Sequence, residues 1–148
     1  MRRTLASLLV AVSAAGLLVG LAGTASASAL PVSGDCVAYG DVPHLNVGGT
    51  SRIVTTGTFS CAAAHPGMAI TVCIEEMYGV AGPWYSRGCT SDSDLNELRT
   101  SLTATHSMSV PVYATYLRTV VRGTNADGSS VNYTSPPVFW FNCACYIG

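Results

Sequence analysis

Polar and hydrophobic residues alternate along most of the chain after Leu30, and no stretch there keeps a helical period. Short β-branched and aromatic runs are separated by clusters of Gly, Pro, Asn and Asp. A period of two is typical of half-buried strands, and frequent turn residues are typical of antiparallel sheets. The pattern predicts an all-β protein, namely an antiparallel two-sheet sandwich of about seven strands with an immunoglobulin-like architecture.

Seven segments carry the strand pattern, at residues 37–45, 51–62, 68–78, 84–89, 107–123, 130–134 and 138–145. In the second of these, Ile53, Phe59 and Cys61 share one face, which we assign to the core. Residues 91–102 depart from the pattern and fit either one or two helical turns or a polar loop.

Two turn signals occur near the end of the chain. The Asn-Ala-Asp-Gly sequence at residues 125–128 predicts a hairpin. Pro136 and Pro137 cannot donate hydrogen bonds to a neighbouring strand. They therefore place this part of the chain at a sheet edge or a bulge.

The first 29 residues have the three-part pattern of a secretory signal peptide. Arg2 and Arg3 precede an apolar run at residues 5–21, which is followed by small residues with cleavage options after Ala27 or Ala29. An uncleaved N-terminal anchor is the alternative, since the run is nearly long enough to span a bilayer. We expect residues 1–29 to be removed and residues 30–148 to form one secreted domain.

The charge of the remaining chain is acidic. Without Arg2 and Arg3 it has five arginines, no lysine and eight acidic residues, which gives a formal charge of −3. This composition argues against a nucleic-acid partner, which needs a basic patch, and against attraction to anionic membranes. The absence of lysine favours a GC-rich coding genome, such as that of an actinobacterium.

All the cysteines follow the signal segment, at positions Cys36, Cys61, Cys73, Cys89, Cys143 and Cys145. An even number in an exported chain predicts three disulfides. A zinc site is the alternative, but Cys143 and Cys145 are the only closely spaced pair, and no second pair or nearby histidine accompanies them. We therefore expect disulfides, no metal and no cofactor.

Residues 71–90 read as a strand, a glycine-rich turn and a second strand. A register centred on Ala81 places three pairs opposite one another: Cys73 and Cys89, Glu75 and Arg87, and Met77 and Tyr85. The register predicts a Cys73–Cys89 disulfide on the outward face. Ile70, Val72 and Ile74 alternate with these residues and are assigned to the core.

The other four cysteines are harder to pair. Phe139, Phe141, Cys143 and Cys145 alternate onto one face, which we assign to the core together with Cys61. This favours Cys61 bonded to Cys143 or Cys145, which leaves Cys36 for the other. A Cys36–Cys61 pair is the open alternative. A direct Cys143–Cys145 bond is not favoured, because side chains two apart on a strand lie roughly 6.5–7 Å from one another.

The sequence gives no catalytic site. Glu75 and Glu76 are adjacent on a strand and point to opposite faces, so they cannot act together as general acid and general base. Residues 92–96 resemble the start of an EF-hand loop but lack its later glycine and glutamate. The histidines, His44, His65 and His106, have no shared spacing, and there is no G-x-S-x-G nucleophile motif.

Aromatic residues give the binding hypothesis. Tyr78, Trp84 and Tyr85 gather at the turn of the hairpin, and Trp140 alternates away from Phe139. If exposed, they would stack on sugars or fill a pocket of a protein partner; the alternative is a small cluster that packs the turn. We expect a non-catalytic domain that binds an extracellular protein or carbohydrate. The alternatives are an inhibitor of a secreted hydrolase, and a carbohydrate-binding or cell-surface structural protein.

Peptide mapping of the unreduced protein tests the hairpin register. We expect a peptide containing Cys73 to be recovered joined to one containing Cys89. Either residue joined to a different cysteine would refute the register.

Overall fold

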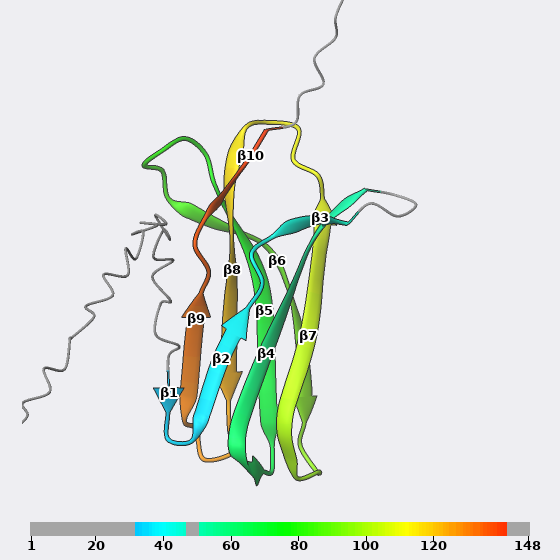
Figure 1. The fold of residues 1–148 in the computed structure, drawn as a ribbon, viewed down its shortest axis with the longest axis vertical. Helices are drawn as coiled ribbons and strands as arrows, with labels where there is room; N and C mark the ends of the chain where they lie inside the picture. Colours follow the sequence, from blue (N-terminus) through cyan, green and yellow to red (C-terminus); the bar gives the residue numbers. More distant parts are fainter. Residues whose placement is uncertain (1–31, 47–50, 142–148) are drawn as a thin grey trace, which may run out of the picture.

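The fold is seen in a computed structural model, which describes residues 32–46 and 51–141 (Figure 1). These residues form ten strands: β1 (Val32–Ser33), β2 (Cys36–Gly40), β3 (His44–Asn46), β4 (Arg52–His65), β5 (Met68–Met77), β6 (Trp84–Asp94), β7 (Arg99–Ser109), β8 (Thr115–Thr124), β9 (Ser130–Thr134) and β10 (Val138–Trp140). The expected signal segment lies outside them, as do Cys143 and Cys145. Among the described residues, no helix long and apolar enough to cross a membrane was found.

The strands form two antiparallel sheets that pack face to face (Figure 1). In the first sheet, β7 pairs with one edge of β4. β3 and β2 pair with the other edge, β3 at residues 52–54 of β4 and β2 at residues 57–61, and β1 pairs with β2. In the second sheet the order is β6, β5, β8, and then β9 and β10 in succession along the outer edge of β8. The chain therefore changes sheet between β4 and β5, between β6 and β7, and between β7 and β8.

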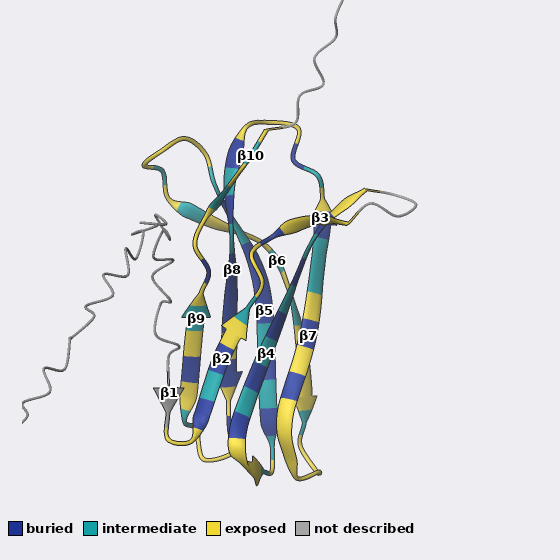
Figure 2. Ribbon diagram, in the orientation of Figure 1, coloured by how far each residue is buried: buried dark blue, intermediate teal, exposed yellow. Residues whose placement is uncertain are grey.

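The core lies between the sheets and follows the predicted alternation (Figure 2). Ile53, Phe59 and Cys61 are buried on one face of β4, as expected. Ile70, Val72 and Ile74 are also buried, as expected. The buried apolar residues form two clusters. The larger cluster surrounds Phe59 and Met68, and the smaller one consists of Ile53, Ile74, Met108 and Leu117.

Two glycines leave room for side chains of the opposite sheet. A β-carbon on Gly123 of β8 would overlap the ring of Phe59 on β4. A β-carbon on Gly57 would lie 2.6 Å from Cγ2 of Val72 on the opposite sheet. Burial of a phenyl ring stabilises a fold by about 1.5–3 kcal/mol, and the missing β-carbon at Gly123 makes room for it.

A buried polar contact joins the sheets between the two apolar clusters. The hydroxyls of Thr55 on β4 and Thr119 on β8 lie 2.6 Å apart, and both lie within hydrogen-bond distance of the carbonyl of Asp41. Asp41 lies in the break between β2 and β3. The Thr119 carbonyl accepts a hydrogen bond from the amide of Ser135, in the break between β9 and β10, and the Thr119 amide donates to the Ser135 hydroxyl, both over 2.9 Å. One residue therefore holds both interrupted edges in place.

The structure has two disulfides among the described residues, Cys73–Cys89 and Cys36–Cys61. Cys73 lies directly opposite Cys89, as the hairpin register predicts. The preferred pairing of Cys61 with Cys143 or Cys145 is wrong, because Cys36 lies directly opposite Cys61 on the neighbouring strand β2. Strand pairing brings the two sulfurs together without any crossing of the sandwich.

The rest of the predicted hairpin register is wrong. A bulge between Cys73 and Glu75 shifts the pairing, so that Glu75 lies opposite Ser86 and Met77 lies opposite Trp84. Gly88 has a φ of 121° at this point, a backbone conformation that residues with a side chain rarely adopt. Within the bulge β6 has one more residue than β5. Each later residue of β5 therefore lies opposite the residue of β6 that precedes its predicted partner.

Two further expectations need correction. Residues 91–102 form no helical turn; β6 and β7 continue through most of this segment with a short bend between them. The expected strand at 107–123 is divided by a turn at residues 110–114, around the buried Pro111. This segment is extended because β6 pairs with β5 and β7 pairs with β4.

The expectations for residues 125–137 are confirmed. The Gly128 amide donates to the carbonyl of Asn125 over 3.0 Å, and this turn joins β8 to β9. Pro136 and Pro137 separate β9 from β10 at the edge of the sheet.

Replacement of Thr55 by valine tests the polar contact. Because Thr119 and the Asp41 carbonyl lose a buried partner, we expect the free energy of unfolding to fall by about 1–3 kcal/mol in a urea titration. Thr56→Val is the matched control, since its hydroxyl bonds Thr105 on the exposed face over 3.1 Å. The control should change stability by less than about 0.5 kcal/mol. Equal effects in the two variants would contradict a special role for the buried contact.

Candidate binding surface at one end of the sandwich

Several exposed large apolar residues belong to the β5–β6 and β7–β8 loops and to the adjoining ends of β6 and β10, which lie at one end of the sandwich, at the top of Figures 1 and 2. We call this surface the aromatic end; it comprises Tyr78, Val80, Tyr85, Val112, Tyr113, Phe139 and Phe141. Val80 is 84% exposed and Tyr113 is 69% exposed. Monomeric proteins rarely expose so many large apolar groups in one place without a function.

The four aromatic residues singled out in the sequence divide into three groups. Tyr78 and Tyr85 are exposed and lie together, with ring centroids 6.4 Å apart. Trp84 is half-buried on the outer face of the second sheet, where the Arg118 guanidinium lies 4.0 Å from its ring centroid. Trp140 is half-buried: it packs against the smaller core cluster and lines a depression of about 450 Å³ together with Phe141.

The orientation of β10 is the reverse of the one expected. Phe139 and Phe141 are 57% and 64% exposed, whereas Trp140 packs inward. The alternation was correct, but it could not show which face turns inward. Tyr113, Val112 and Val80 were also missed, because isolated apolar residues in loops have no period.

A row of apolar side chains crosses the outer face of the second sheet next to the aromatic end. Strand pairing places Trp84 opposite Met77, Met77 opposite Tyr116 and Tyr116 opposite Phe139. The rings of Tyr116 and Phe139 have centroids 5.0 Å apart and planes tilted by 51°. The exposed surface therefore extends from the loops onto the sheet.

A buried carboxylate supports the β5–β6 loop. Glu76 is 1% exposed; its Oε2 accepts a hydrogen bond from the Tyr78 hydroxyl at 2.9 Å and forms an ion pair with Arg87, whose Nε lies 3.1 Å away. The hydrogen bond to Glu76 raises the pKa of Tyr78 above its usual value, because the phenol must give up a donated bond to ionise. The predicted Glu75–Arg87 pair is wrong, since the bulge moves Arg87 to Glu76.

Glu75 has a different partner, on the outer face of the sheet. Its Oε2 lies 2.7 Å from Nη2 of Arg118, the residue that also covers Trp84. Glu75 and Glu76 thus point to opposite faces, as expected, and each is paired with an arginine.

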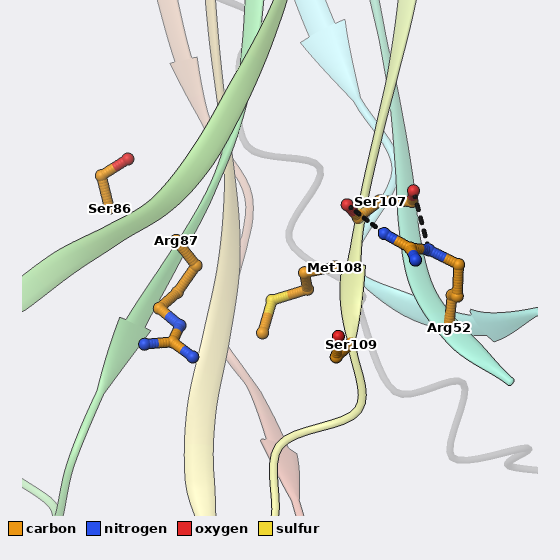
Figure 3. Close-up of a pocket in the computed structure, with 6 residues that line it drawn as sticks. All are labelled: Arg52, Ser86, Arg87, Ser107, Met108 and Ser109. Atoms are coloured by element: carbon orange, nitrogen blue, oxygen red, sulfur yellow. Dashed lines mark hydrogen bonds between the residues drawn. The ribbon is translucent and has the colours of Figure 1, made fainter.

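A shallow depression of about 430 Å³ opens between β6 and β7 (Figure 3). Figure 3 shows Met108 between two arginines, Arg52 and Arg87. Arg52 donates to the hydroxyl and the carbonyl of Ser107, both over 3.1 Å, and Arg87 is held by Glu76. The guanidinium groups in this depression are therefore already engaged within the chain.

His106 lies on the same strand as Ser107, and its Nδ1 is 3.1 Å from the Thr90 hydroxyl. Burial, and then the charge of Arg52, lower its pKa, so the ring stays neutral near neutral pH. A neutral histidine beside a threonine can position a hydroxyl, but no carboxylate is bonded to this ring among the described residues.

A group of metal-ligand residue types lies at the opposite end of the sandwich. Ligand atoms of Asp35, Cys36, Cys61 and His65 all lie within 4.8 Å of one another. The two cysteines are bonded to each other, and His65 is hydrogen-bonded to Asp35. His44 and His106 are not part of this group. The sequence signal was weak, because the antiparallel pairing of β2 with β4 assembles the group from two distant segments.

Comparison with known proteins does not indicate a function. No protein-family model matches the chain, and no curated protein matches it. A solved structure of a β-glucosidase from Kluyveromyces marxianus, in complex with glucose, is similar over 70% of this chain and 15% of the glucosidase chain. The identity is 10% and the TM-score is 0.28, a likeness that carries no argument about activity or ligand.

Replacement of Arg87 by alanine tests the support of the loop. The buried Glu76 carboxylate would keep only Tyr78 as a partner, so we expect a loss of about 1–3 kcal/mol in unfolding free energy, less than for a fully buried pair because Arg87 is nearly half exposed. Arg122→Ala is the control, as an exposed arginine without an ion pair among the described residues. In a urea titration, the free energy of unfolding of the control should lie within about 0.5 kcal/mol of that of the unmodified protein. An Arg87→Ala loss that small would contradict the role given to this pair.

Proposed function

We propose that the protein is a secreted, non-catalytic binding domain whose aromatic end docks onto an extracellular protein. The observation that carries the proposal is the exposure of seven large apolar residues on neighbouring loops and strands at one end of the sandwich. Binding surfaces are rich in tyrosine, tryptophan and phenylalanine, because these side chains bury a large area at a small cost in conformational entropy.

The topology supports an immunoglobulin-like assignment within this proposal. If the two-residue β1 is set aside, and β2 with β3, and β9 with β10, each count as one interrupted strand, the described residues form seven main strands. The first, second and fifth form one sheet, and the fourth, third, sixth and seventh form the other in that order. In sandwiches of this kind the loops at one end carry recognition.

Secretion is supported by two separate features. The chain begins with a charged segment, an apolar run and small residues with cleavage options, the pattern of a signal peptide. Two disulfides within the described residues are typical of proteins that fold in an oxidising compartment.

The ring geometry favours a protein over a polysaccharide. Sugars stack on an open aromatic face, but the Arg118 guanidinium covers one face of Trp84. The two ring pairs are tilted, by 50° for Tyr78 with Tyr85 and by 51° for Tyr116 with Phe139. A flat polysaccharide chain could not stack on both rings of a tilted pair at once, whereas side chains of a protein can fill such angles.

Inhibition of a secreted hydrolase is the second candidate, and the β5–β6 loop favours it. Val80 at the tip is 84% exposed, while Tyr78 at the base is held by the buried Glu76. A preorganised loop binds an active site with less loss of entropy than a mobile one.

A retention experiment with matched variants tests the proposal. The protein and two variants are immobilised and exposed to concentrated proteins of the producing organism's culture medium. Val112→Ser with Tyr113→Ser alters the aromatic end, and Leu95→Ser with Leu98→Ser alters two equally exposed residues in the β6–β7 loop at the other end. We expect the first variant to lose retention of a specific protein by at least about 10-fold, the effect of losing one strong contact, and the second to retain it.

Two outcomes would contradict the proposal, and a third would identify the kind of protein bound. Equal retention by both variants would remove the aromatic end as the docking surface. Retention on cellulose or chitin with no protein bound would indicate a carbohydrate-binding domain. Stoichiometric loss of activity when a secreted protease is titrated with the protein would favour the inhibitor.

A further inference from the structure

The residues around the Cys36–Cys61 disulfide have the composition of a metal site. Asp35 Oδ1 lies 3.4 Å from the Cys36 sulfur and 2.9 Å from Nε2 of His65. All four ligand atoms, including the Cys61 sulfur, lie within 4.8 Å of one another. Four ligands bound to zinc at about 2.0–2.3 Å in a tetrahedron lie roughly 3.3–3.8 Å apart, so the cluster needs only small movements to reach that geometry.

The strands that carry the two cysteines do not depend on the disulfide for their register. Five residue pairs join β2 to β4, from Cys36–Cys61 to Gly40–Gly57. The Ala62 amide also donates to the carbonyl of Asp35 over 3.0 Å. If the disulfide were reduced, these hydrogen bonds would keep the two thiols facing one another.

Neighbouring groups are placed as outer partners of metal ligands usually are. The Ala63 amide donates to Oδ2 of Asp35 over 2.9 Å, which leaves Oδ1 directed at the cluster. The side-chain amide of the buried Asn125 donates to the Cys36 sulfur over 3.2 Å. Hydrogen bonds of this kind orient ligands and stabilise the charge on a thiolate.

The donor set selects the kind of metal. Two thiolates with one imidazole and one carboxylate suit zinc, whereas calcium and magnesium require mainly oxygen ligands. We propose that Asp35, Cys36, Cys61 and His65 form a zinc site when the Cys36–Cys61 disulfide is reduced, so that the disulfide and the metal are alternative ways of closing this end of the sandwich.

The proposal has two steps, reduction of the disulfide and binding of zinc, and a phosphine can serve as the reductant. The phosphorus gives two electrons to the disulfide, the S–S bond breaks, and one water supplies the oxygen of the phosphine oxide and the protons of the two thiols. Zinc then displaces those two protons into solvent and forms two Zn–S bonds. The proton that Nε2 of His65 donates to Oδ1 of Asp35 moves through solvent to Nδ1 of the same ring, and Nε2 and Oδ1 then each bind the metal.

Cobalt titration tests the site, because tetrahedral cobalt bound to thiolates gives charge-transfer and visible absorption bands. The protein carries Cys143→Ser and Cys145→Ser, which removes thiols outside the described residues, and it is measured oxidised and after phosphine treatment. We expect one cobalt per reduced chain, none in the oxidised protein, and displacement of cobalt by zinc.

Two histidine variants distinguish a site that includes His65 from nonspecific binding of cobalt by the thiols alone. In the reduced protein, His65→Gln should weaken cobalt binding by at least about 10-fold, since loss of even an outer partner costs 10- to 100-fold. His44→Gln is the matched control, an exposed histidine on β3, and should leave binding unchanged.

Several results would overturn the proposal. These are absence of the thiolate bands in the reduced protein, equal binding by the two histidine variants, and binding that survives Cys36→Ser with Cys61→Ser but is lost with Cys73→Ser and Cys89→Ser. Circular dichroism follows the fold during reduction. If the reduced chain unfolds and cobalt does not restore its strands, the proposal also fails, because it requires β2 and β4 to stay paired.

Discussion

The contact between the ring of Phe59 and the backbone of Gly123 sets the distance between the two sheets. Both residues lie on central strands, β4 and β8, so their contact fixes the middle of the sandwich rather than an edge. Gly57 meets Val72 and Val121 of the opposite sheet in the same way. With the sheets this close, only small or matching side chains fit between them, and the apolar core divides into two clusters with a polar contact between them.

The division of the core explains why one end of the molecule has an exposed aromatic surface. The larger cluster fills the end that holds the Cys36–Cys61 disulfide. At the other end, among the described residues, the smaller cluster is packed only by Val110 of the β7–β8 loop and by Val138 and Trp140 of the short strand β10. Too little sheet remains there to bury residues such as Tyr78 and Tyr113, so they face solvent and supply a surface for a partner.

The alternation of residues predicted the long strands and their buried faces, because each strand has one face in the core and one in solvent. It could not predict that a bulge moves Arg87 from Glu75 to Glu76, since an extra residue leaves no mark in the hydrophobic pattern. It also could not show whether Trp140 or Phe139 turns inward on a short edge strand. The metal-ligand cluster depends on strand pairing across distant segments, which no local spacing reveals.

The direct test of this architecture is a nuclear Overhauser measurement on isotope-labelled protein in solution. Close packing of β4 on β8 predicts strong cross-peaks between the ring protons of Phe59 and the α-protons of Gly123. The same spectrum should link the methyl groups of Thr55 and Thr119, which lie on opposite sheets. A well-dispersed spectrum that lacks the Phe59–Gly123 cross-peaks would show that the sheets do not meet here, and the account of the core and of the aromatic end would be wrong.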